Sequence, residues 1–330
     1  MQTNFAPERL RDPEIAEVNS ILRNCVHCGL CTATCPTFVT LGDELDSPRG
    51  RIYLIKDMLE NDRPATGDVA RHVDRCLSCL SCMTTCPSGV HYMHLVDHAR
   101  AHIERTFPRP FNDRALRWLL GNVLTRPGRF RLALLAAALA KPFAGLLPMS
   151  STLGRRLRAM LRLAPARLPA PSAWDRPGTH AARGERRMRV ALLAGCAQPV
   201  LAPGINEATI RLLTRMGVEV VLPQGAGCCG SLAHHIGQRG NAMGFARANV
   251  EAWSREIAQG GLDAIVVNAS GCGTTIKDYG FMFREDPLAA QAAEVSKRAV
   301  DISELLTRLG YAPTRRAEGV TIAYHAARSS

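Results

Sequence analysis

Two cysteine runs with the same spacing constrain this chain more than any other feature. Residues 25–36 read CVHCGLCTATCP and residues 76–87 read CLSCLSCMTTCP, so both follow the pattern C-x2-C-x2-C-x3-C-P. This spacing is typical of proteins that hold two 4Fe-4S clusters. Three closely spaced thiolates reach one cluster, and the fourth, which precedes proline, reaches the other. The runs therefore predict a two-cluster electron carrier.

The paired runs also predict which cysteines share a cluster, because the fourth cysteine of each run completes the cluster of the other run. The predicted ligands of cluster one are Cys25, Cys28, Cys31 and Cys86. The predicted ligands of cluster two are Cys76, Cys79, Cys82 and Cys35. Such clusters lie next to each other, as an electron relay requires.

Two other uses of these cysteines fit less well. Structural zinc sites pair C-x2-C units across a longer gap and do not need a third cysteine at two-residue spacing or a trailing Cys-Pro. Disulfides belong to oxidising compartments, and residues 1–13 contain no apolar secretory core. We therefore expect a cytoplasmic protein without a signal peptide.

The positive charge of the chain is concentrated in one segment. The formal net charge is +12, and residues 105–189 contain 18 Lys and Arg against three acidic residues. The apolar blocks in this segment are interrupted, the longest by Lys141-Pro142, so we predict no transmembrane helix. Its amphipathic pieces could lie on an anionic bilayer or pack against a domain or an acidic partner subunit. No nucleic-acid motif accompanies the charge, and we predict no nucleic-acid partner.

Sequence patterns divide the chain into three parts. Residues 1–106 predict an all-helical cluster domain, with helices at 13–24, from Pro48, at 68–74 and at 92–105. Residues 107–187 form the basic amphipathic linker or docking segment. Residues 188–330 alternate strands and helices, which is typical of an open, mostly parallel α/β sheet. The fold class is therefore α+β multidomain.

The predicted elements of the third part can be located individually. Strands are expected at 189–194, 218–222, 263–268 and 320–324, and helices at 206–216, 241–258 and 288–309, the last broken near Asp301. The four remaining cysteines follow the ends of the first three strands, where open α/β sheets bind ligands. These cysteines are Cys196, Cys228, Cys229 and Cys272. They predict an additional metal, cluster or thiol redox site, or else small residues in glycine-rich turns; His234 and His235 could ligate or shuttle protons.

The motifs together resemble a known family. The double run, Ser47-Pro48-Arg49-Gly50-Arg51, the Cys196 to Cys228-Cys229-Gly230 spacing and the sequence around Cys272 are similar to the iron-sulfur subunit of glycolate oxidase (glycolate dehydrogenase). Related proteins serve glycerol-3-phosphate dehydrogenase, lactate utilisation and heterodisulfide reductase. The resemblance implies two 4Fe-4S clusters and no catalytic residue on this chain. It also implies FAD on partner glycolate oxidase subunits, and electron transfer toward a quinone at the inner membrane.

The alternatives within this resemblance are a lactate or glycerol-3-phosphate dehydrogenase subunit, or a thiol/disulfide redox subunit like those of heterodisulfide reductase. The chain departs from the family pattern at two places. Cys272 is not followed by a second cysteine in a C-x-x-C pair, and after Tyr324-His325 the second Cys-Cys-Gly unit is absent. We therefore expect a C-terminally shortened member of the family, with only the first Cys-Cys-Gly unit.

Overall fold

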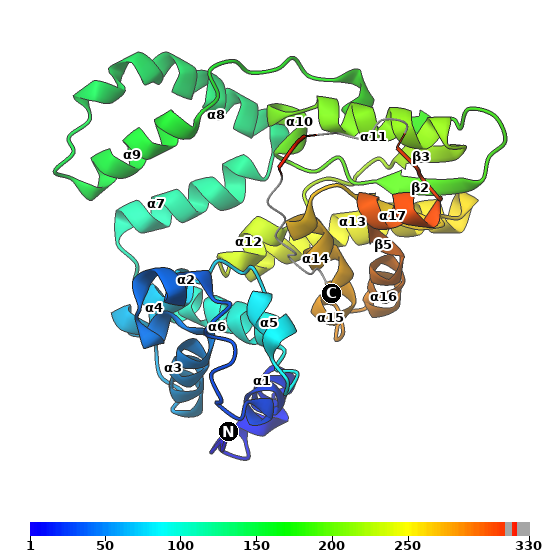
Figure 1. The fold of residues 1–330 in the computed structure, drawn as a ribbon. Helices are drawn as coiled ribbons and strands as arrows, with labels where there is room; N and C mark the ends of the chain where they lie inside the picture. The colour runs from blue at the N-terminus through cyan, green and yellow to red at the C-terminus, as the bar shows by residue number, and fades with distance from the viewer. Residues whose placement is uncertain (314–318, 322–330) are drawn as a thin grey trace.

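The computed structural model describes residues 1–313 and 319–321. In chain order it has a helical N-terminal part, a helical arm and an α/β part built around one sheet (Figure 1). This arrangement confirms the predicted fold class, an all-helical domain followed by a mostly parallel α/β domain.

Six α-helices and two short 3-10 turns form the N-terminal part. They are η1 (Arg9–Arg11), α1 (Pro13–Asn24), α2 (Pro36–Leu41), η2 (Glu44–Asp46), α3 (Pro48–Glu60), α4 (Gly67–Asp74), α5 (Ser81–Thr85) and α6 (Tyr92–Thr106). Local sequence explains where the longer ones begin. The side chains of Asp12 and Ser47 accept hydrogen bonds from the first turns of α1 and α3, and each helix starts with proline. The four predicted helices of this part are confirmed.

Apolar side chains on α1, α3, α4 and α6 form one buried core, which includes Ile21, Ile55 and Leu95. Cys25 belongs to this core, and Cys76, Cys82 and Cys86 pack against it. The helices therefore cover the inner side of the cysteine loops, and the outer side of the loops faces solvent.

The basic segment folds into a helical arm. Its elements are α7 (Phe111–Leu119), the π-helix η3 (Leu120–Leu124), α8 (Pro127–Ala140), η4 (Lys141–Leu146), α9 (Thr152–Leu163) and the 3-10 turn η5 (Ala173–Asp175). Helices α8 and α9 lie side by side and project from the rest of the molecule (Figure 1). Among the described residues, no helix has the length and apolar character needed to cross a membrane.

The C-terminal part is a five-stranded sheet with helices on both faces. The strands are β1 (Gly178–His180), β2 (Met188–Leu192), β3 (Val218–Leu222), β4 (Ala264–Val267) and β5 (Ala299–Asp301), in the spatial order β1-β3-β2-β4-β5. Strands β3, β2, β4 and β5 are parallel, and β1 is antiparallel to β3. The helices are α10 (Gln198–Leu201), α11 (Gly204–Arg215), α12 (Ser231–His235), α13 (Arg239–Gly260), α14 (Ser270–Lys277), α15 (Tyr279–Met282), α16 (Ala289–Arg298) and α17 (Ile302–Arg308).

Two apolar cores lie on opposite faces of the sheet. One packs Ala191 and Ile265 against Trp253 of α13, and the other packs Val190 and Leu192 against helices that include α11. Neighbouring residues of β2 thus point to opposite cores, as the alternation of side chains along a strand requires. This explains why β4, and β2 from Val190 onward, read as continuous apolar runs.

Two strands of the sheet differ from the sequence expectation. The stretch 288–309 was expected to be helical with a break near Asp301, but the break is the strand β5, which pairs with β4. Strand β1 was not expected and lies inside the basic segment, where it pairs with β3. Both have three residues, too short to show a strand pattern in sequence. The strand expected at 320–324 lies largely outside the described residues.

Candidate metal centres

The first cysteine run forms a loop between two helices. Cys25 ends α1, and Cys35 caps the start of α2. Within the loop, His27 and Gly29 have left-handed backbone conformations, with φ of 60° and 87°. Left-handed residues in such a loop turn backbone N–H groups inward, which makes a concavity of the kind seen at many Fe–S sites.

The second run repeats this backbone at equivalent positions. Ser78 and Leu80, which correspond to His27 and Gly29, have φ of 52° and 58°. A leucine in this conformation costs roughly 1–2 kcal/mol, whereas glycine adopts it freely. The second loop therefore keeps the backbone of the first although leucine occupies the position of Gly29. Sequence reasoning did not anticipate these turns, and Gly29 was their only signal.

Two neighbouring cavities lie inside these loops. The first is lined by the predicted ligands of cluster one: Cys25, Cys28, Cys31 and Cys86. The second is lined by the predicted ligands of cluster two: Cys35, Cys76, Cys79 and Cys82. Cys82 and Tyr92 line both cavities. The fold therefore brings the fourth cysteine of each run to the cavity of the other run, although the assignment of each ligand stays a prediction.

The crowding of these thiols fits a cationic iron centre. Burial raises the pKa of Cys31, and the neighbouring Cys25 and Cys86 add to the effect. Burial also raises the pKa of Cys82, with a further contribution from Cys76. Thiolates crowded together in this way need the positive charge of a metal, because iron-sulfur clusters bind the deprotonated form.

The four cysteines of the α/β part also meet at one place. Their thiols lie close enough for one to shift the pKa of the next: Cys196 acts on Cys228, Cys228 on Cys229, and Cys272 on Cys229. These residues follow the carboxyl ends of β2, β3 and β4, as the sequence pattern indicated. The structure thus brings the four predicted residues together, while metal binding by them stays a prediction.

The state of these thiols bears on the thiol/disulfide alternative. A hydrogen bond with Cys228 and burial both raise the pKa of Cys196. Its hydrogen bond with Cys196 lowers the pKa of Cys228, but the contact with Cys229 and burial outweigh it and raise that pKa to about 12. The attacking species in disulfide exchange is the thiolate. Without a metal these cysteines are therefore poor nucleophiles at neutral pH.

Two buried side chains that sequence reasoning missed support the Cys228-Cys229 turn. The amide of Asn249 donates to the carbonyl oxygen of Cys228 at 2.9 Å, and the hydroxyl of Tyr279 donates to that of Cys229 at 2.7 Å. Gly230 has φ of 84°, and a Cβ there would lie 2.8 Å from a backbone oxygen of α13. The signal in the sequence was a polar residue on the otherwise apolar face of α13.

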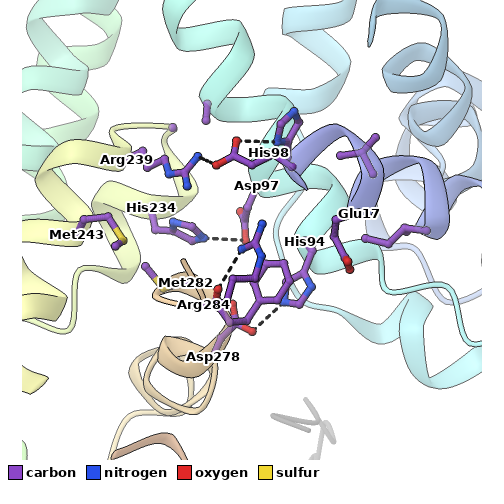
Figure 2. Close-up of a pocket in the computed structure, with 16 residues that line it drawn as sticks. Glu17, His94, Asp97, His98, His234, Arg239, Met243, Asp278, Met282 and Arg284 are labelled. Carbon is purple, nitrogen blue, oxygen red and sulfur yellow. Dashed lines mark hydrogen bonds and ion pairs between the residues drawn. The ribbon is translucent and has the colours of Figure 1, made fainter. Parts of the chain in front are cut away.

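His234 and His235 contact the N-terminal part of the chain. Both pair with the buried Asp97 of α6, at 3.3 and 3.0 Å. His234 lines a cleft between the helical domain and the α/β part, where His94 also pairs with Asp278 at 2.8 Å (Figure 2). These histidines are therefore engaged in joining the two domains.

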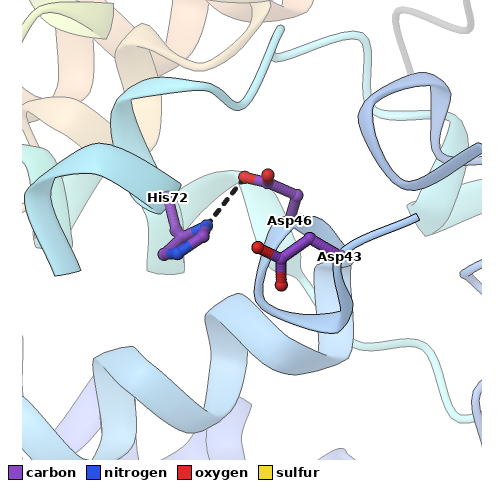
Figure 3. Close-up of side chains that lie close together, drawn as sticks. All are labelled: Asp43, Asp46 and His72. Atoms are coloured by element: carbon purple, nitrogen blue, oxygen red, sulfur yellow. Dashed lines mark hydrogen bonds and ion pairs between the residues drawn. The ribbon is translucent and has the colours of Figure 1, made fainter. Parts of the chain in front are cut away.

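A third cluster of possible metal ligands lies beside the second cysteine run. One side-chain atom each of Asp43, Asp46 and His72 lies within 4.8 Å of the others (Figure 3). However, the carboxylate of Asp46 also pairs with the guanidinium groups of Arg51 and Arg75, at 3.4 and 2.8 Å. Two cations beside the only buried carboxylate make this an ion-pair network rather than a cation site.

Comparisons with known proteins agree with this division of the chain. Residues 21–90 match the model of the 4Fe-4S dicluster domain, and residues 190–277 match that of the cysteine-rich domain. Over 307 residues the chain is 43% identical to the glycolate oxidase iron-sulfur subunit of Escherichia coli, covering 93% of this chain and 70% of that protein. The chain belongs to the glycolate oxidase iron-sulfur subunit family. The predicted resemblance and the predicted 4Fe-4S cofactors are thereby confirmed.

Other relatives of the chain are more distant. It is 32% identical over 299 residues to the probable glycolate oxidase iron-sulfur subunit of Bacillus subtilis, covering 88% of this chain and 66% of that protein. It is 30% identical over 125 residues to lactate utilization protein A of an Exiguobacterium species, covering 35% of this chain and 49% of that protein. No solved structure matches the chain.

Proposed function

We propose that this chain transfers electrons within a flavin-dependent glycolate dehydrogenase. Partner subunits that carry FAD would remove two electrons from glycolate and form glyoxylate. This chain would receive the electrons singly on its two 4Fe-4S clusters and pass them toward a membrane quinone. Its own residues would hold the clusters and exclude water, and none would contact glycolate.

One observation carries this proposal: each of two neighbouring cavities is lined by the first three cysteines of one run and reached by the fourth cysteine of the other run. Cys82 and Tyr92 line both cavities, which keeps the two sites close enough to act in sequence. Buried helices on one side limit solvent access, which is one determinant of reduction potential.

The test is to purify the protein without oxygen and to measure iron, acid-labile sulfide and the EPR spectrum after dithionite reduction. We expect about eight irons per chain, following the ligand count of two 4Fe-4S clusters. Colourless protein with tightly bound zinc would contradict the proposal.

Ligand variants test the crosswise arrangement. Cys86→Ser should alter the same EPR signal as Cys28→Ser, although Cys86 lies in the other run. Cys35→Ser should alter the same signal as Cys79→Ser. A Cys86→Ser variant that instead alters the Cys79→Ser signal would show that each run binds its own cluster.

The helical arm supports the membrane side of the proposal. Residues 114–174 contain eleven Lys and Arg and no acidic residue. Exposed apolar residues recur on one face of α8 (Leu132, Leu135 and Leu139) and on one face of α9 (Leu153, Leu157 and Met160). Between them, Phe143 and Leu146 of η4 are 63% and 82% exposed. Large apolar surfaces beside basic residues fit the headgroup region of an anionic bilayer.

Vesicle sedimentation tests this docking. The protein should bind vesicles that contain phosphatidylglycerol and bind phosphatidylcholine vesicles weakly. Because each basic residue near such a surface contributes about 1 kcal/mol, the double variant Arg155→Ala/Arg162→Ala should bind roughly 30-fold more weakly. The matched control is Arg183→Ala/Arg187→Ala, which removes the same charge outside the arm. Equal losses in both variants, or no binding by the wild-type protein, would contradict membrane docking and favour an acidic partner subunit.

A further inference from the structure

The two predicted cluster sites have the same cysteine spacing but different hydrogen-bonding neighbours. At the second site, Nη1 of Arg51 donates to Sγ of Cys35 at 3.8 Å, and the hydroxyl of Tyr92 donates to Sγ of Cys76 at 3.7 Å. Within residues 1–313 and 319–321, no side chain donates a hydrogen bond to the sulfurs of the first site. Those sulfurs belong to Cys25, Cys28, Cys31 and Cys86.

Arg51 places a fixed positive charge beside the second site. It is only 1% exposed, and its other donors bind the carbonyl oxygen of His72 at 2.7 Å and the hydroxyl of Thr37 at 3.0 Å. Its ion-pair partner Asp46 lies 3.4 Å away and also pairs with the partly exposed Arg75 at 2.8 Å, so Asp46 compensates the charge of Arg51 only in part. A charge in such surroundings is screened little by water or salt.

The corresponding arginine beside the first site is different. Arg49 lies in the first turn of α3, and its guanidinium lies beside Gly29 of the first loop, but its side chain is partly exposed. Its guanidinium binds both carboxylate oxygens of Glu44, at 2.6 and 3.2 Å. The charge of Arg49 is therefore neutralised by a close partner and screened by solvent.

We propose that Arg51 and Tyr92 raise the reduction potential of cluster two above that of cluster one, so that electrons collect on cluster two. Reduction adds one negative charge to a cluster, and hydrogen bonds to its sulfurs and a nearby cation stabilise that charge. Arg51 and Tyr92 would stabilise the added negative charge when one electron passes from the first site to the second, a transfer that would make or break no bond. Solvent at the exposed Cys28 would raise the reduction potential of cluster one, which is the opposite effect. Solvent reorients freely, however, whereas four hydrogen-bond partners fix the guanidinium of Arg51 beside cluster two.

This inference rests on the two clusters of the proposed function, and EPR-monitored redox titration of the anaerobic protein tests it. Cys79→Ser first identifies the EPR signal of cluster two. In the wild-type protein, that signal should titrate at the higher potential. Arg51→Gln should weaken reduction of cluster two about tenfold, a downward shift of 59 mV for one electron. Tyr92→Phe, which removes only a hydroxyl, should weaken reduction of cluster two about threefold. Arg51→Lys keeps the positive charge and should therefore lose much less than Arg51→Gln.

The matched control is Arg49→Gln, which removes a neighbouring arginine and should leave the potential of cluster two unchanged. If Arg51→Gln does not fold, the reduction potentials of Tyr92→Phe still test the proposal. Clusters present but unshifted in Tyr92→Phe, or a shift of the other signal, would overturn this inference and leave the proposed function standing. Absence of iron in the wild-type protein would overturn both.

Discussion

The two cysteine runs are alike in backbone and different in surroundings. Both loops place left-handed residues at the same two positions, glycine at the second position in one and leucine in the other. Beside the first cluster site, the Arg49–Glu44 pair is partly exposed, whereas beside the second site, Arg51 and Asp46 are buried. The comparison teaches that a repeated motif can keep its ligand geometry while the fold around it makes the two sites electrostatically unequal.

The largest expected effect is on stability at the second run. Asp46→Asn leaves two arginines and a histidine around a buried site without their carboxylate, and we expect it to lower the free energy of unfolding by about 3–5 kcal/mol. Glu44→Gln beside the first run should cost no more than about 1 kcal/mol, because that pair is exposed. Urea unfolding followed by circular dichroism measures both. Similar losses in the two variants would remove the contrast between the loops.

A second prediction concerns pH, because the second run is also tied to the α/β part. Arg100 donates to the carbonyl oxygen of Cys76 at 2.6 Å and lies 3.8 Å from Asp97, the partner of His234. Burial would raise the pKa of Asp97, but His234 and His235 outweigh it and hold that pKa well below its usual range. Burial would lower the pKa of His234, but Asp97 outweighs it and raises that pKa.

The signs of these shifts define a pH window. Because the pKa of His234 is raised in the folded protein, its ion pair with Asp97 stabilises the fold fully below about pH 6.5. This contribution is lost as the pH rises through the raised pKa. The lowered pKa of Asp97 stabilises the fold above about pH 4 and loses its effect as the pH falls. The protection factors of the α6 and α12 amides, which are corrected for the intrinsic pH dependence of hydrogen exchange, should therefore be higher at pH 5.5 than at pH 8.5. Asp97→Asn should abolish this difference between the two pH values and lower the free energy of unfolding by about 2 kcal/mol. An unchanged pH profile in this variant would contradict the role given to the Asp97–His234 pair.

The smallest effect is expected in the first loop. Gly29→Ala places a Cβ at φ of 87° and against the guanidinium of Arg49, so the Arg49–Glu44 pair must shift. We expect a loss of about 1–2 kcal/mol in the free energy of unfolding. Gly42→Ala is the control, because Gly42 has φ of 69° and open space around it. It should show the backbone cost of about 1 kcal/mol alone, and a greater loss at Gly42 than at Gly29 would contradict the role given to Arg49.

Sequence patterns located most of the fold. Helix α1 and strand β3 have the predicted bounds, β4 lies within the predicted range, and β2 begins one residue before the predicted range, because caps, proline and apolar runs are local signals. Strands β1 and β5 were missed because a three-residue strand is defined by the neighbour it pairs with, and that neighbour is distant in sequence. Asn249 and Tyr279 were missed for the same reason, because their hydrogen-bond partners are distant in sequence. The turn after β3 brings the carbonyl groups of Cys228 and Cys229 to them.

The sequence by itself determined that this chain carries two sets of cluster-forming cysteines, because ligand spacing along a loop is a local property. It also determined that four further cysteines follow three parallel strands. Only the tertiary structure decided that sulfurs of one set receive hydrogen bonds from a buried guanidinium and a tyrosine hydroxyl, while in the described residues no side chain donates to the sulfurs of the other set. The physical reason is that hydrogen bonds and electric fields act through space, and Arg49 and Arg51, two residues apart on one helix, end up in opposite environments.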